Sequence, residues 1–440
     1  MGFNVFKNTV LLFVLVLISC ASKLKNEKGL DVNKNEILKH TSTVLSTKVQ
    51  DGKGIIVGAN QIEDYLPLLQ GKRVGVVANQ SSVIFKDIGQ KTDAGSYTHL
   101  VDSLLSLNID IKTVFAPEHG FRGTADAGEK IKDGIDTKTG VPIISLYSAN
   151  KKPKLEQLKE TKKYEKDVEK GVSRIDVMVF DLQDVGVRFY TYISTLHYVM
   201  EACAEANIPL IILDRPNPNG HYIDGPILEM EHKSFVGMHP IPVAHGMTIG
   251  EYAQMINGEK WLKNGAQCEL KVIPIKNYTH KTAYSLPIKP SPNLPNDKAI
   301  NLYPSLCFFE GTNVSVGRGT KFQFQIFGSP FLNNELYDFQ FTPQPNDGAK
   351  YPKHQGKLCY GKNLVLTENL NTLNLNWLIE AYKNTKNKDE FFNAFFTKLA
   401  GTKKLQKQIE SGLSEAEIKE LWKEGLEAFK TVREKYLIYE

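Results

Sequence analysis

The stretch Arg73-Val-Gly-Val-Val-Ala-Asn79 is an apolar run of strand length that ends on a polar residue. The same pattern recurs three times in the first half of the chain, as Lys112–Pro117 before Glu118, Arg174–Phe180 before Asp181, and Pro209–Leu213 before Asp214. Strands that alternate with helices form a mostly parallel sheet with helices on both faces. The carboxyl ends of such strands open onto one crevice, so we expect these four polar residues to converge on an active site.

The elements between these runs define the domain boundaries. A Rossmann-like α/β domain is predicted over residues 54–237, with a strand at Pro142–Tyr147 and helices at Gln61–Leu69, Tyr97–Leu107, Lys154–Lys170 and Tyr192–Asn207. A smaller α+β domain is predicted over residues 238–440, with the active site in the cleft between the two. It includes a helix at Thr248–Trp261, a strand at Glu269–Pro274, a proline-rich crossover or hinge at Leu286–Pro295, and helices after Asn376.

The N-terminus has the pattern of an export signal. Lys7 precedes the apolar run Val10–Ile18, which is too short to span a bilayer but has the length of a signal h-region. The following Leu-Ile-Ser-Cys20 looks like a lipobox, so we expect a signal peptide over 1–19, acylation of Cys20 and a tether over 20–53. A plain signal peptide or a buried helix is the alternative. A lipid-anchored protein of the bacterial envelope, on the periplasmic side of a membrane, follows from the first interpretation.

Composition excludes several classes of function. The net charge of +5 comes from lysines on predicted surface helices without interleaved aromatic residues, which argues against nucleic-acid binding. The remaining cysteines, Cys203, Cys268, Cys307 and Cys359, have no metal-binding spacing and are predicted to be buried free thiols. No G-x-G-x-x-G, Walker or G-x-S-x-G motif occurs in the required context, and we expect no cofactor.

Arginine is scarce and concentrated near these motifs. Four of the seven arginines, Arg122, Arg188, Arg215 and Arg318, follow closely on polar motif residues. A rigid bidentate donor suits a carboxylate ligand, although a structural salt bridge is the alternative for each of them.

The densest motif is Phe115-Ala-Pro-Glu118-His119-Gly-Phe-Arg122-Gly123. A glutamate held on stiff backbone between aromatic residues can act as a general acid, with helix capping or a salt bridge as the structural alternative. The loop 124–140 that follows could close over a substrate, and its spacing does not fit an EF-hand cation loop.

Three further segments supply hydrogen-bonding groups suited to a polyhydroxylated ligand. They contribute Gln183, Asp184, Arg188 and Tyr190 after the third strand, Arg215 and Asn217 after the fourth, and Glu310 and Arg318 in the second domain. Bracing of loops is the alternative for each set. His239, His245 and Glu251 lack the spacing of a metal site, so we predict satisfied or loop histidines and no metal.

Taken together in this order, five strings resemble the NamZ (YbbC-like) exo-β-N-acetylmuramidases over residues 54–440. They are Val-Ala-Asn79-Gln-Ser, Phe-Ala-Pro-Glu118-His-Gly-Phe-Arg-Gly, Phe-Asp181-Leu-Gln-Asp-Val-Gly-Val-Arg188, Leu-Asp214-Arg-Pro-Asn-Pro, and Glu310-Gly-Thr-Asn-Val-Ser-Val-Gly-Arg-Gly-Thr.

The resemblance implies a hydrolase that removes N-acetylmuramic acid from the non-reducing end of peptidoglycan fragments, with Glu118 as the catalytic residue. His119 would tune it, and Glu310, Asp181 or Asp184 would activate water, attack the sugar or orient its acetamido group. Asn79 and the arginines would bind substrate, one arginine selecting the lactyl carboxylate. The open alternatives are an envelope lipoprotein that binds muropeptides without cleaving them, and an amidase or esterase.

Overall fold

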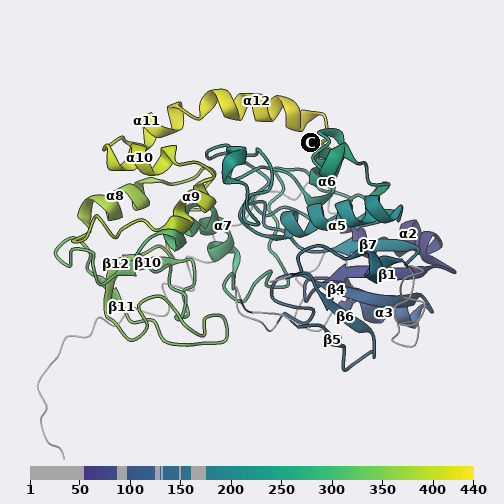
Figure 1. The fold of residues 1–440 in the computed structure, drawn as a ribbon. Helices are drawn as coiled ribbons and strands as arrows, with labels where there is room; N and C mark the ends of the chain where they lie inside the picture. Colours follow the sequence, from purple (N-terminus) through teal and green to yellow (C-terminus); the bar gives the residue numbers. More distant parts are fainter. Residues whose placement is uncertain (1–53, 87–96, 124–128, 130–131, 148–149, 160–174) are drawn as a thin grey trace, which may run out of the picture. The chain divides into compact units, whose positions relative to one another are not determined.

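In the computed structural model, residues 54–86, 97–123, 129, 132–147, 150–159 and 175–440 are described (Figure 1). Their centre is a seven-stranded sheet of order β5-β6-β4-β1-β7-β8-β9. All neighbouring pairs are parallel except β5 with β6. The strands are β1 (Arg73–Ala78), β4 (Asp110–Ala116), β5 (Gly134–Ile135), β6 (Pro142–Ser145), β7 (Val177–Asp181), β8 (Leu210–Leu213) and β9 (Leu270–Ile273).

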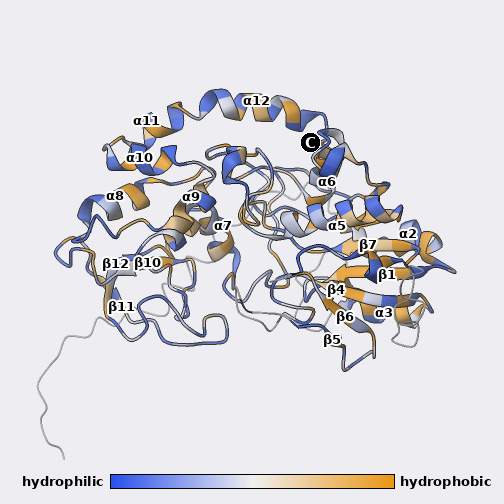
Figure 2. Ribbon diagram, viewed as in Figure 1, coloured by the Kyte–Doolittle hydropathy of each residue, from blue (hydrophilic) through white to orange (hydrophobic). Residues whose placement is uncertain are grey.

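Helices cover both faces of this sheet because neighbouring residues of each strand point to opposite sides. In β1, Val74 and Val76 pack with α2 (Ile62–Leu69) and α3 (Leu100–Ser106). Val77, on the other face, belongs to the large core that includes α5 (Tyr192–Ala206) and α6 (Ile249–Gly258). Figure 2 shows the central strands as the most hydrophobic part of the α/β region. The predicted α/β architecture with a mostly parallel sheet is confirmed.

The C-terminal part is smaller and mixed. Its three-stranded antiparallel sheet has the order β10-β12-β11 and precedes a series of short helices. The elements are α7 (Asp297–Leu306), the 3-10 helix η6 (Cys307–Gly311), β10 (Ile326–Ser329), β11 (Phe339–Phe341), β12 (Cys359–Asn363), α8 (Asn376–Asn384), α9 (Ala394–Ala400), α10 (Lys404–Glu410), α11 (Glu415–Glu420) and α12 (Lys423–Glu434). Residues 53–440 form one compact unit, and the domain boundary at 237/238 stays a prediction.

Two local predictions differ from the structure. The expected helix Tyr97–Leu107 begins only at Leu100, because Tyr97–His99 forms β3 and pairs with β2 (Val83–Phe85). The His99 side chain then accepts a hydrogen bond from the Val101 amide and caps the helix. Of the expected helix Lys154–Lys170, α4 (Leu155–Leu158) is present, and residues 160–174 lie outside the described part. The remaining short elements are η2 (Gly58–Asn60), η4 (Met230–His232) and η5 (Lys263–Gly265).

The four cysteines of the folded part are buried and free, as predicted. Cys20 and the predicted signal peptide and tether lie outside the described residues. Among the helices that are described, none combines the length and the apolar character needed to cross a membrane.

Candidate active site

The carboxyl edge of the sheet brings together the polar residues that follow the strands. From the strand order, Tyr147, Glu118, Asn79, Asp181 and Asp214 succeed one another along this edge, after β6, β4, β1, β7 and β8. The chain adds strands in one direction from β1 to β6 and in the other from β7 to β9. The edge at β1 and β7 is therefore a topological switch point, where ligands of open α/β sheets bind.

Glu118 is held at this edge by hydroxyl groups. It is partly buried, and its Oε2 accepts a hydrogen bond of 2.8 Å from Thr191 Oγ1 at the start of α5. Burial, the charge of Glu118 and a hydrogen bond to it together raise the pKa of Tyr147 above its usual value. Two hydroxyl groups, those of Thr191 and Tyr147, thus bond to Glu118, and neutral partners of this kind suit a group that gives and takes a proton.

The backbone after Glu118 is unusual. His119 has a φ of 73° and Gly120 a φ of 77°, so two consecutive residues lie in the left-handed region that a histidine rarely adopts. His119 is also buried, with 4% of its surface exposed. A strained backbone beside a candidate catalytic group indicates that the fold fixes the position of Glu118 at some energetic cost.

Asn79 connects the strand end to the tyrosines of α5. Its Nδ2 donates to Tyr192 Oη at 2.7 Å, and its Oδ1 accepts from both the amide and the hydroxyl of Ser81. The side chain is fully buried, so Asn79 stabilises the wall of the site and does not make the substrate contact that we predicted.

Glu310 and Arg318 come to the site from the C-terminal part. Glu310 lies on η6, and its Oε1 accepts from Arg318 Nη1 at 3.1 Å, with both side chains about one quarter exposed. Tyr303, on α7, has its pKa raised mainly by burial and also by the carboxylates of both Glu310 and Glu118. Glu118 and Glu310 both therefore act electrostatically on one tyrosine.

Lys353 fixes the segment that carries Glu310. Its Nζ lies 3.1, 2.5 and 3.1 Å from the carbonyl oxygens of Phe309, Thr312 and Val314. Burial lowers the pKa of Lys353 to about 8, and the charge of Glu310 opposes this effect. Sequence reasoning missed this lysine because it is distant in sequence from every motif.

Asp181 has a different role from the predicted catalytic one. It is fully buried, and its two oxygens accept from Arg215 Nε at 2.5 Å and Nη2 at 2.9 Å. Arg215 Nη2 also donates to the Val83 carbonyl. A bidentate ion pair that joins β7 to the turn after β8 leaves neither group directed at a ligand.

Arg188 is also structural. Its side chain is fully buried, and its two terminal nitrogens donate to four backbone carbonyls at 2.6–2.9 Å, those of Pro226, Ile241, Leu399 and Ala400. The donors expected to meet a substrate carboxylate instead connect the α/β region to α9.

Arg122 binds acidic residues of the protein. It contacts Asp136 at 2.7 Å and Asp102 of α3 at 3.5 Å, and its guanidinium lies 4.3 Å from the ring centre of Phe121. The salt bridge that was the structural alternative is therefore present. In the loop 124–140, Glu129 pairs with Lys350, whereas Asp126 lies outside the described residues.

Asp184 and Gln183 are buried loop residues. Asp184 Oδ2 accepts from the Gly186 amide at 2.6 Å and lies 4.0 Å from His245 Nε2, and burial raises the pKa of Asp184 to about 7. Gln183 Nε2 donates to the carbonyls of Asp184 and Pro216. Both predicted substrate residues are thus turned toward the protein.

The polar residues that follow β8 also bind other groups of the protein. Asp214 accepts from Thr248 Oγ1, the Gly250 amide and Tyr439 Oη, the last at 2.7 Å, and burial raises its pKa to about 6. Asn217 Nδ2 donates to the Met247 carbonyl at 2.9 Å. These predicted ligand groups brace the loops in the structure.

His239 is a satisfied buried histidine, as predicted. Its ring nitrogens lie 2.9 Å from His197 Nδ1 and 2.8 Å from Tyr252 Oη. Glu251 accepts from Thr248 N and pairs with His280 at 2.9 Å. His239 and Glu251 thus each have hydrogen-bond partners within the protein.

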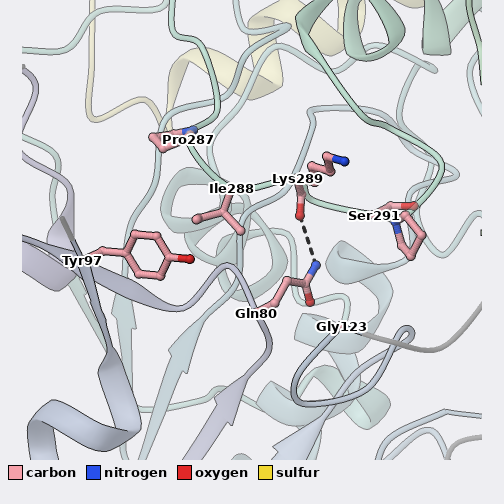
Figure 3. Close-up of a pocket in the computed structure, with 8 residues that line it drawn as sticks. Gln80, Tyr97, Gly123, Pro287, Ile288, Lys289 and Ser291 are labelled. Atoms are coloured by element: carbon pink, nitrogen blue, oxygen red, sulfur yellow. Dashed lines mark hydrogen bonds between the residues drawn. The ribbon is translucent and has the colours of Figure 1, made fainter. Parts of the chain in front are cut away.

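A pocket opens between the loops that follow Asn79 and Glu118 and the proline-rich segment (Figure 3). Its volume is about 460 Å³, and its lining includes the loop that follows Glu118 and the proline-rich segment, through Gln80, Tyr97, Gly123, Pro287, Ile288, Lys289, Ser291 and Pro292. The proline-rich segment is an ordered wall, because Gln80 Nε2 donates to the carbonyls of Lys289 and Pro290 at 3.1 Å. Tyr190 Oη also donates to the Pro290 carbonyl, at 2.7 Å, instead of to a ligand.

Known proteins resemble this chain over most of its length. A curated peptidoglycan β-N-acetylmuramidase NamZ from Bacillus subtilis is 38% identical over 420 residues, which are 90% of this chain and 93% of that protein. Crystal structures of two DUF1343 family proteins from Bacteroides fragilis match with TM-scores of 0.75 and 0.71 at 46% and 27% identity, each covering 88% of this chain and 99% of theirs. Residues 74–298 and 301–439 match the models of the N- and C-terminal regions of exo-β-N-acetylmuramidase NamZ. The predicted family and enzyme class are thereby confirmed, and the chain belongs to the NamZ family of exo-β-N-acetylmuramidases.

Proposed function

We propose that this protein is an exo-acting glycoside hydrolase that releases N-acetylmuramic acid from the non-reducing ends of peptidoglycan fragments, with Glu118 as general acid. The observation that carries the proposal is the placement of Glu118 at the carboxyl edge of the sheet, after the strand β4 that neighbours β1 at the switch point, bonded to Thr191 and close to Tyr147. Family membership supports the substrate class.

Glycoside hydrolysis needs a proton donor for the leaving oxygen and a second group that meets the positive charge developing on the sugar. Thr191 Oγ1 donates to one oxygen of Glu118 and so fixes the orientation of the carboxyl group that we propose as the proton donor. Among the predicted partner carboxylates, Asp181 is paired with Arg215 and Asp184 is bonded to Gly186. Glu310, partly exposed and near the same tyrosine as Glu118, is the partner that we retain.

Arg318 is the arginine that we retain for recognition of the lactyl carboxylate. Arg188 and Arg215 are buried and bind protein groups, whereas Arg122 pairs with Asp136 and Asp102, and Arg318 with Glu310, the carboxylate retained above. Arg318 is partly exposed beside Glu310 and lies between Gly317 and Gly319, whose φ values of 77° and 81° create a close-fitting turn.

The direct test is chromophore release from nitrophenyl glycosides. We expect the wild-type protein to hydrolyse nitrophenyl N-acetyl-β-muraminide. Hydrolysis of the matching glucosaminide, which lacks the lactyl group, should be at least about tenfold slower. Equal rates on both would remove muramic acid as the preferred sugar. Saturable binding of the muraminide without turnover would show that the protein is a receptor and not a hydrolase.

We also propose that acylated Cys20 anchors the protein to a membrane of the bacterial envelope, which would hold it beside its substrate. The support is the lipobox-like Leu-Ile-Ser-Cys20 after a short apolar run. In cells, a Cys20→Ala variant is expected to lose labelling by an alkyne fatty acid and to leave the membrane fraction. Unchanged labelling of that variant would contradict the anchor.

A further inference from the structure

We propose that Lys353 is a positioning residue for the hydrolysis, and that its ammonium group, held in a cage of backbone carbonyls, keeps Glu310 in the orientation that turnover needs. The inference rests on the proposed function, in which Glu310 is the carboxylate that acts with Glu118. Lys353 lies 43 residues after Glu310 and outside every predicted motif.

The segment that carries Glu310 builds the cage. Residues 309–314 leave the 3-10 helix η6, and four of their carbonyl oxygens surround Lys353 Nζ. The distances from Nζ are 3.1 Å to Phe309, 3.5 Å to Glu310, 2.5 Å to Thr312 and 3.1 Å to Val314. Carbonyls at the end of a helix lack partners within it, and a lysine can supply the donors. Both peptide groups that flank Glu310 therefore contact one ammonium group.

The other two carbonyls of residues 309–314 are also bound. The Asn313 carbonyl lies 2.6 Å from His354 Nε2, and the Gly311 carbonyl accepts from the Asn393 amide at 2.9 Å. His354 has a φ of 61°, a conformation that a histidine rarely adopts, so this loop is bent where it meets the segment. Since all six carbonyls have donors, the backbone around Glu310 has little freedom to move.

The charge of Lys353 acts on the same two side chains that the proposed function retains. The Glu310 carboxylate favours the ammonium form of Lys353, whereas burial and the Arg318 guanidinium oppose it and lower its pKa. The preceding residue, Pro352, lies against Gly319, where an added Cβ would come within 2.6 Å of the proline side chain. Ionisable groups with perturbed pKa values gather at functional sites. Lys353 is thus placed to hold the backbone of Glu310 and to attract its carboxylate.

The experiment removes the charge and then returns it. Lys353→Ala lacks the atoms from Cγ to Nζ, which together have the size of propylammonium. We expect kcat on nitrophenyl N-acetyl-β-muraminide to fall about 10- to 100-fold, because a small displacement of a catalytic group has an effect of this size. Added propylammonium should raise this kcat at least about fivefold, the effect of one restored hydrogen bond. Propanol, which has the same shape and no charge, and sodium chloride at equal ionic strength should not raise it.

Two further variants control for space and for the loop. Lys353→Met fills the space with a neutral side chain, so it should be slow and should not respond to propylammonium. Lys357→Ala, the same change at an exposed position of the loop, should keep the wild-type kcat with and without propylammonium. Thermal unfolding of each variant measures the effect on stability separately.

A double variant shows whether Lys353 acts through Glu310. Glu310→Gln should be slow by itself, and adding Lys353→Met to it should lower kcat by no more than about twofold, because residues that act as one unit are not additive. An equal fall in both backgrounds, a wild-type kcat in Lys353→Met, or a folded Lys353→Ala that ignores propylammonium would each overturn the inference and leave the hydrolase standing. Loss of the fold in both Lys353 variants would show a structural role and would overturn it as well.

Failure of the proposed function gives different results. A wild-type kcat in Glu310→Gln would refute Glu310 as the partner of Glu118, and the role of Lys353 with it. A wild-type protein without turnover of the muraminide would refute the hydrolase itself.

Discussion

Replacing Glu118 with glutamine is expected to lower kcat/KM on the disaccharide of N-acetylmuramic acid and N-acetylglucosamine at least about 100-fold. A sugar hydroxyl is a poor leaving group that must be protonated as the bond breaks, and general acid catalysis contributes about 10²–10⁴-fold. Glutamine keeps the shape and can still accept from Thr191, whose hydroxyl lies 2.8 Å from Oε2. The change therefore removes the proton and little else.

The leaving group distinguishes an acid from a structural residue. Dinitrophenolate departs without a proton, so the loss in Glu118→Gln should be much smaller on dinitrophenyl muraminide than on the disaccharide. Glu63→Gln, an exposed change in the first turn of α2, is the matched control and should leave both rates unchanged. A loss of equal size for good and poor leaving groups would argue for a role other than proton donation. Full activity on the disaccharide would place the acid at another residue.

Replacing Asp181 with asparagine is expected to reduce the free energy of unfolding by about 3–5 kcal/mol. The carboxylate is fully buried and binds Arg215 through both oxygens. Removal of one partner leaves the other charge buried and uncompensated, which is the costly way to break such a pair. Urea denaturation followed by tryptophan fluorescence measures the change.

The same sheet offers a matched control. Asp176 precedes β7 and binds Arg73 of β1 through two bonds of 3.0 Å, but these side chains are 27% and 33% exposed. Asp176→Asn should therefore cost about 1 kcal/mol or less, because water screens an exposed pair. A catalytic Asp181 would give the opposite pattern: a variant of nearly wild-type stability that has lost turnover.

The sheet could be predicted from sequence because its signal is local. β1 has the predicted bounds, and β4, β6, β8 and β9 lie within a few residues of the predicted strands, since buried parallel strands appear as short apolar runs. The antiparallel pair β2 and β3 was missed, because its pairing joins segments of three residues that carry no clear alternation. At Tyr97 the pairing with Phe85 overrode the helical pattern.

The candidate site was harder to predict because a polar residue at a strand end can face a ligand or the protein. Glu118 and Asp181 have the same kind of position, yet Asp181 binds an arginine from the next strand turn and Glu118 binds the hydroxyl of Thr191. That difference depends on pairing over 34 residues, which no local pattern records. Tyr147 could have been found, because β6 was predicted and the strand-end rule applies to it as well. Thr191 and Tyr303 could not be predicted as site residues, because their positions depend on how α5 and α7 pack.

The bond between Tyr439 and Asp214 constrains how the protein can be made. After Asp214, which follows β8, the ribosome must add 225 residues before the hydroxyl of Tyr439 can donate to the Asp214 carboxylate. Until then, the emerging chain holds a buried acid without its full set of donors at the middle of its sheet. The sheet therefore gains this last contact to Asp214 only when synthesis is almost complete, so the final packing around β8 follows the C-terminal end of the chain.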